Sequence, residues 1–230
     1  MSFQERSYSG NLLRPTPEIH IEEDGSVGIV ATPWGHRQGA KRVIETLLDY
    51  ISSSRNDMEA TSPFQMMTCL SPLANTLRVA VMLANDSLYR EENRNEYTSG
   101  VELLVFAAKD EELAWAQIGS PNLFLMRQKV GLIPLSTQID LATELSDQTE
   151  LAPLPANLIG LNPTSNFSIN SIRPHQGDQL IFLSRSRTPK EFYTLNPSAL
   201  TLESITQKLS ADSSELPFWV GQYQIPLRAA

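Results

Sequence analysis

Four short apolar runs follow one another closely in the middle of the chain, and they constrain the fold more than any other feature. They occupy residues 101–108, 113–118, 123–126 and 131–135. The runs have little helical period, and breaks such as Lys109-Asp110 and Gly119-Ser120-Pro121 separate them. Tightly spaced apolar runs of this kind are typical of antiparallel strands joined by hairpin turns. The sequence therefore predicts an antiparallel meander here.

Helical and extended patterns surround this meander. Before it, apolar residues recur every three or four positions over residues 38–52 and 73–88, which predicts two amphipathic helices. A β-branched run at residues 26–31 predicts a buried strand. After the meander, residues 136–170 are rich in turn-forming residues and are expected to be mostly irregular, with a helical turn or two at residues 139–145. The chain is then expected to end with a strand, a helix and a strand, at residues 179–184, 197–210 and 218–225.

Composition bounds the class of protein. The chain has 230 residues, of which 41% are apolar and 19% charged, as expected for one globular domain spanning residues 1–230. A formal net charge of −8 disfavours nucleic acid as a partner, because affinity for a phosphate backbone comes mainly from Lys and Arg. The polar N-terminus lacks the apolar stretch of a secretory signal, and no window approaches the ~18 apolar residues that span a bilayer. We therefore expect a cytoplasmic protein without membrane contact.

The single cysteine limits the chemistry further. Cys69 cannot form an internal disulfide, and no set of Cys and His residues suggests a zinc site. Its apolar neighbourhood predicts a small buried hydrophobe without catalytic function.

Four segments of the chain resemble the metal-dependent type 2C (PPM) Ser/Thr protein phosphatases. GIVATPWGHRQGAKRVIETLLDYI at residues 28–51 is similar to the family's strand ending in Ala-Asp-Gly-Met-Gly-Gly-His and its following helix. LAWAQIGSPNLFLMRQKVGLIPLS at residues 113–136 resembles the strand, Gly-Asp-Ser-Arg corner and Arg-x-Gly turn. HQGDQLIFLSRSRTPKEF at residues 175–192 resembles the Pro-Gly-Asp-x-Leu-Leu-Leu-x-Ser-Asp-Gly segment, and the elements after Pro197 match the family's closing helix and strand.

The resemblance implies a fold class and an architecture. It implies an α+β domain in which two antiparallel sheets, flanked by helices, form a four-layer αββα sandwich. The family places a flap beside its active site, at the position of residues 136–170, and the segment here is expected to be a shortened version of it.

The family's chemistry implies a pair of divalent metals held largely by aspartates, and hard cations of this kind require oxygen ligands that are mostly anionic. The degenerate positions are Thr32-Pro33 and Arg185-Ser186, each in place of Asp-Gly, and Ser120 and Asn122, in place of the corner's Asp and Arg. No clear match exists for the last metal aspartate, and Arg14 and Glu18 only weakly resemble the N-terminal Arg and acid of the family. We therefore predict no catalytic residues, no bound metal and no cofactor.

A different set of residues is a candidate for ligand binding. The set consists of Trp34, His36, Arg37, Asn122, Arg185 and Arg187. The resemblance would gather its arginines around the former phosphate position, where a guanidinium suits a phosphate or a carboxylate. Alternatively, Arg185 is a structural cation that pairs with a surviving carboxylate such as Glu18. Trp34 is either an exposed anchor for a partner or a plug for the vacated cavity.

These observations predict a catalytically inactive phosphatase homologue that serves as a protein-binding or regulatory signalling module. Its partner is expected to be another protein, with a phosphorylated or acidic ligand as the alternative. Two other functions stay open: an active phosphatase with unconventional metal ligands, and a sensor that binds a small molecule or phosphate in the remodelled pocket. The sequence leaves the oligomeric state undecided.

Overall fold

The computed structural model describes residues 3–56, 64–138, 140–145, 151–197 and 200–225. The chain divides into two compact units. The first unit comprises Met1–Thr16, Gly119–Ala156 and Pro174–Ala230, and the second unit comprises Pro17–Ile118 and Asn157–Arg173. A single domain spanning residues 1–230 stays a prediction.

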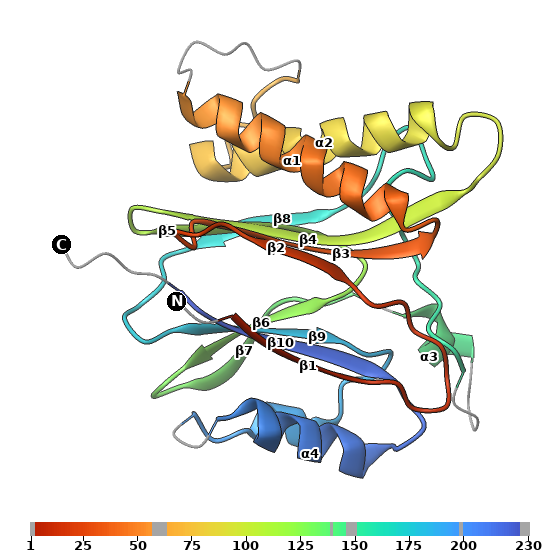
Figure 1. Cartoon of the computed structure of the whole chain (residues 1–230). Coiled ribbons are helices and arrows are strands. Elements are labelled where there is room, and N and C mark those ends of the chain that lie inside the picture. Colours follow the sequence, from red (N-terminus) through yellow and green to blue (C-terminus); the bar gives the residue numbers. More distant parts are fainter. Residues whose placement is uncertain (1–2, 57–63, 139, 146–150, 198–199, 226–230) are drawn as a thin grey trace. The chain divides into compact units, whose positions relative to one another are not determined.

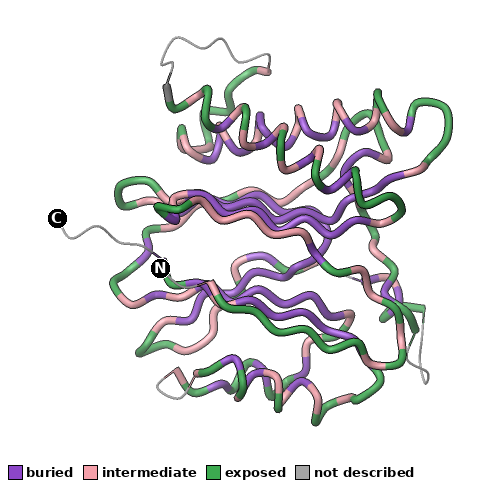
Figure 2. Tube along the Cα trace, in the orientation of Figure 1, coloured by how far each residue is buried: buried purple, intermediate pink, exposed green. Residues whose placement is uncertain are grey.

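The second unit is an antiparallel sheet with the strand order β2-β3-β4-β5-β8. Its strands are β2 (Glu18–Ile21), β3 (Val27–Gly35), β4 (Ser99–Lys109), β5 (Glu112–Ile118) and β8 (Ser168–Ile172). Helices α1 (Gln38–Asn56) and α2 (Pro72–Glu91) lie over one face of the sheet (Figure 1). Both helices bury the apolar stripes that the sequence displays, and the purple segments of Figure 2 follow the inner sides of the helices and the sheet.

Capping residues set the beginning of α2. The Ser71 hydroxyl accepts a hydrogen bond from the Ala74 amide at 3.1 Å, and Pro72 occupies the first turn, where its missing N–H costs nothing.

The first unit contains the other antiparallel sheet, which has the strand order β1-β10-β9-β6-β7. Its strands are β1 (Phe3–Tyr8), β6 (Asn122–Arg127), β7 (Gly131–Ser136), β9 (Gln179–Ser184) and β10 (Phe218–Gln224). Helix α4 (Leu202–Asp212) packs on this sheet through Leu202, Ile205 and Leu209. The short helix α3 (Leu141–Leu145) and the 3-10 helix η1 (Lys190–Thr194) complete the described elements.

The prediction of two antiparallel sheets flanked by helices is confirmed, and the predicted helices and strands are present with shifted ends. The prediction of one continuous meander was wrong. β5 pairs with β4 and β8, whereas β6 pairs with β7 and β9 in the other sheet. Gly119, with a φ of 67°, turns the chain out of the extended conformation directly after β5, so the hairpin pattern is interrupted at this corner.

Two further expectations needed correction. Strand β8 lies in the segment predicted to be mostly irregular, because its sequence, SINSI, is polar and short and carries little strand signal. Cys69 is exposed, although it was expected to be buried, since it lies in the turn before α2 where an apolar neighbour does not provide cover. Within the described ranges, no helix combines the length and apolar character needed to cross a bilayer.

Candidate functional site

Arg185 directly follows β9, and its side chain is fully buried. Strand β9 is an almost continuous buried apolar run, so its end delivers the next residue into the interior of the first unit. There the guanidinium Nη2 lies 3.1 Å from Asp212 Oδ2 and donates to the Ser213 carbonyl oxygen at 3.4 Å. A charge removed from water needs an opposite charge and hydrogen bonds to be tolerated. Asp212, at the end of α4, provides the charge, and the Ser213 carbonyl oxygen accepts a hydrogen bond.

Arg187 contacts the same carboxylate from the outside. Its Nη2 lies 3.6 Å from Asp212 Oδ2, and 55% of its side chain is exposed. The structure thus brings Arg185 and Arg187 together around Asp212, with one guanidinium buried and the other accessible. The intervening Ser186 is half-buried.

Arg185 pairs with a carboxylate, as one of the two alternatives expected, but the carboxylate belongs to Asp212 and not to Glu18. Glu18 instead accepts a hydrogen bond from Arg37 at 2.8 Å in the second unit. The sequence does not single out Asp212, because a charged residue at the end of a helix is usually exposed to solvent. Nothing in the local sequence indicates that the end of β9 approaches it.

The chain segment that leads from β5 into β6 carries Ser120 and Asn122, which are 8% and 7% exposed. Asn122 begins β6, and its side-chain oxygen accepts a hydrogen bond from the Gln138 amide at 2.8 Å. The side chain therefore fixes a backbone segment of the first unit. The sequence offered Asn122 as a candidate for ligand binding and did not predict this structural contact.

Thr32, Pro33 and Trp34 lie inside β3, where the strand was expected to have ended. They pair with β4 in register, Thr32 opposite Glu102 and Pro33 opposite Val101. The Trp34 indole Nε1 donates to Glu102 Oε2 at 3.0 Å, and Glu102 is only 2% exposed. Trp34 is half-buried and tied to the neighbouring strand, so it is not the freely exposed anchor that the sequence offered as one alternative.

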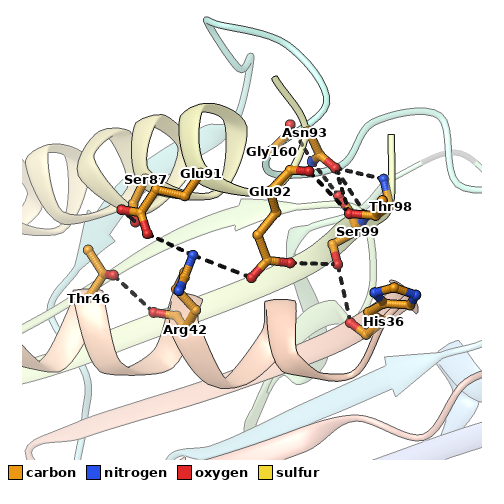
Figure 3. Close-up of polar contacts among 10 residues, drawn as sticks. All are labelled: His36, Arg42, Thr46, Ser87, Glu91, Glu92, Asn93, Thr98, Ser99 and Gly160. Atoms are coloured by element: carbon orange, nitrogen blue, oxygen red, sulfur yellow. Dashed lines mark hydrogen bonds and ion pairs between the residues drawn. The ribbon is translucent and has the colours of Figure 1, made fainter. Parts of the chain in front are cut away.

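His36 and Arg37 are exposed at the beginning of α1. The His36 carbonyl oxygen accepts from Ser99 Oγ at 3.4 Å, and the same hydroxyl donates to Glu92 Oε2 at 3.1 Å (Figure 3). Arg42 reaches both Glu91 and Glu92, at 2.7 and 3.4 Å. This network joins the start of α1 to the segment between α2 and β4. It involves the backbone of His36, whose imidazole remains available at the surface.

The candidate residues divide between the units. Trp34, His36 and Arg37 belong to the second unit, whereas Asn122, Arg185 and Arg187 belong to the first. Their convergence on one ligand stays a prediction.

The residues at the degenerate positions do not fit a pair of divalent metals. Thr32 and Ser120 offer neutral hydroxyls, and Arg185 brings a buried cation whose contact with Asp212 already uses a carboxylate. Arg14 is also committed, since it lies 3.6 Å from Asp140 with both side chains largely buried. In the part of the chain that the structure describes, no group of three or more His, Cys, Asp and Glu side chains could hold a metal ion.

Comparison with solved structures identifies the fold. No family model matches the sequence, and no curated protein matches it either. Solved structures match over nearly the whole chain. PppA, a key regulatory component of the T6SS in Pseudomonas aeruginosa, is 14% identical with a TM-score of 0.65, covering 97% of both chains. The PPM Ser-Thr phosphatase MsPP from Mycobacterium smegmatis is 15% identical with a TM-score of 0.64, covering 98% of this chain and 99% of MsPP.

A further match agrees with these two. The serine/threonine phosphatase PstP/Ppp of Mycobacterium tuberculosis is 14% identical with a TM-score of 0.62, covering 98% of this chain and 99% of that one. At such low identity a structural match reports on the fold. The chain has the fold of the PPM Ser/Thr phosphatases.

Proposed function

We propose that this chain is a catalytically inactive homologue of the PPM phosphatases that acts as a protein-binding or regulatory module. The observation that carries the proposal is the buried ion pair between Arg185 and Asp212. Arg185 stands where the family resemblance expects a metal-binding aspartate. A guanidinium at this position supplies the positive charge that the family obtains from metal ions.

Electrostatics argue against a metal pair beside this arginine. Two unit charges 4 Å apart interact by about 4 kcal/mol at an effective dielectric constant of 20, and a divalent ion doubles this repulsion. Asp212 cannot offset the cost, because its charge already compensates Arg185. Thr32 and Ser120 add no negative charge. Metal-activated hydrolysis would therefore require Arg185 to leave its buried position.

Exposed guanidinium groups in each unit support a binding role. Arg187 presents its guanidinium at the surface, and Arg37 in the second unit is 69% exposed. Both suit carboxylates or phosphates. We expect the partner to be a protein with an acidic or phosphorylated segment. A regulatory role is compatible with PppA, which is described as a regulatory component of its own system.

The proposal predicts an absence of metal-stimulated turnover. The purified protein should hydrolyse p-nitrophenyl phosphate and a phosphothreonine peptide no faster than buffer, with or without Mn²⁺ or Mg²⁺. The M. smegmatis phosphatase, assayed in parallel, serves as the positive control.

Hydrolysis that requires the metal, is abolished by a chelator and is lost in the Asp212→Asn variant would contradict the proposal. The variant separates turnover by this chain from that of a contaminating phosphatase, which would be unchanged.

A further inference from the structure

A pocket of about 440 Å³ lies in the second unit, and none of the degenerate positions lines it. Its lining comes from α2, from the segment before α2, and from β8 and the segment before it. Its lining is predominantly apolar and includes Phe64, Met67, Met82, Phe167 and Ile169. Phe167 and Ile169 also pack against the core of the unit, so they form a firm base, while Met67 is 42% exposed at the opening. This size falls within the range of small-molecule sites.

A buried side-chain amide in the first turns of α2 holds the wall of the pocket that contains Met67. Asn75, which is 3% exposed, accepts a hydrogen bond from the Met67 amide at 2.9 Å. Its Nδ2 donates to the Met67 and Leu70 carbonyl oxygens at 2.8 and 3.2 Å. The segment that carries Met67 is therefore fixed to the helix by its backbone.

A second buried amide holds the opposite wall. Asn85, 2% exposed, accepts from the Gly160 amide at 2.9 Å and from the Ser165 hydroxyl. Its Nδ2 donates to the Asn162 carbonyl oxygen at 3.0 Å. Because both walls are pinned to α2, the pocket is preformed, and a ligand does not have to spend binding energy on ordering it.

Arg78 gives the pocket a positive charge. It lines the pocket and donates through Nη1 to the Gln65 carbonyl oxygen at 3.0 Å, which fixes the guanidinium without neutralising it. The other charged residue of the lining, Asp86, is 2.7 Å from Arg90 and is compensated by it. Among the described residues, no carboxylate forms an ion pair with Arg78.

We propose that this pocket binds a small apolar carboxylic acid, with the aliphatic or aromatic body against Phe167, Ile169 and Met82 and the carboxylate on Arg78. A carboxylate supplies a negative charge opposite Arg78 and can accept two hydrogen bonds from one guanidinium. The two methionines of the lining adapt to bodies of different shape. The site shares no residue with the proposed ligand-binding positions, so it stands whatever the result of the hydrolysis assay.

Titration calorimetry with decanoate, decanol and decylamine, each below its micelle concentration, tests the proposal. Decanoate should bind saturably at one site, decanol more weakly, and decylamine weakest of all. Arg78→Met should weaken decanoate at least about tenfold, since a charge-assisted hydrogen bond contributes about 1.5–3 kcal/mol. The same variant should change decanol binding less than twofold, and Arg78→Lys should keep part of the preference for the acid.

Two further variants complete the test. Arg94→Met removes an exposed arginine that follows α2 and does not line the pocket, and it should leave decanoate binding unchanged. Met82→Trp fills the pocket and should abolish binding of both decanoate and decanol. The proposal is wrong if decanoate does not saturate, if decylamine binds as tightly as decanoate, or if Arg78→Met and Arg94→Met have equal effects.

Discussion

Replacing Arg127 by methionine is expected to lower the free energy of unfolding by about 3 kcal/mol, because it leaves a buried carboxylate without its cation. Arg127 ends β6 and holds Asp178 through both oxygens, with Nε to Oδ1 at 3.0 Å and Nη2 to Oδ2 at 2.6 Å. The Asp178 side chain is 1% exposed, and after the substitution its carboxylate would still accept a hydrogen bond from the His175 amide, at 2.8 Å. Methionine preserves most of the aliphatic packing of arginine, so the loss reports on the ion pair.

The sign of the pH effect follows from the same contact. The hydrogen bond with Asp178, aided by its negative charge and opposed by desolvation, raises the pKa of Arg127 above its ordinary value. A raised folded-state pKa contributes stability below the unfolded value and loses it as the pH rises through the folded one. The arginine's contribution is therefore fully present at neutral pH, where urea unfolding should be measured.

Arg173 provides the matched control. It lies 3.8 Å from Glu111, and both side chains are about four-fifths exposed, at 82% and 80%. Exposed pairs contribute little, so Arg173→Met should change the unfolding free energy by less than about 0.5 kcal/mol. Equal losses in the two variants would show that burial of Asp178 does not determine the effect.

Replacing Asn93 by alanine is the second substitution with a large expected effect, also about 3 kcal/mol. Asn93 is 3% exposed and follows α2. Its Nδ2 donates to the Ser99 and Gly160 carbonyl oxygens at 2.6 and 2.8 Å, and its Oδ1 accepts from the Thr98 and Ser99 amides at 2.8 and 3.1 Å (Figure 3). Alanine leaves these backbone groups buried without a partner, and each such group costs about 1–3 kcal/mol unless water reaches it.

Asn95 separates this role from a general effect of losing an asparagine. It lies two residues further along, is exposed, and should tolerate alanine within about 0.5 kcal/mol. Chemical unfolding of Asn93→Ala and Asn95→Ala, followed by tryptophan fluorescence, measures the difference. A loss below 1 kcal/mol for Asn93→Ala would mean that the segment before β4 is held by other contacts.

Local patterns allowed most of the elements to be predicted, but not how they associate. The apolar stripes of α1 and α2 and the run in β9 carry their own signal, because burial of one face imposes a period on the sequence. The division of the central strands between two sheets has no such signal. β5 and β6 both look like members of one meander, and only the pairing partners distinguish them.

The same contrast between local signal and tertiary association holds for the candidate site. Comparison with the family's motifs identified Arg185 as the residue that departs most from a metal-binding position. Its partner Asp212 could not be identified, because the pair joins the end of a strand to the end of a helix 27 positions later and depends on tertiary packing. Glu102, which holds Trp34, was missed for a related reason: an isolated acid in an apolar run does not reveal which neighbouring strand lies opposite.

The central claim is that a buried guanidinium occupies the place of a metal-binding acid. The most direct test is a crystal grown with MnCl₂ and measured at the manganese absorption edge. The account predicts no anomalous peak at Asp212, with Arg185 still bonded to its carboxylate. A manganese ion bound to Asp212, with the Arg185 guanidinium displaced, would contradict it.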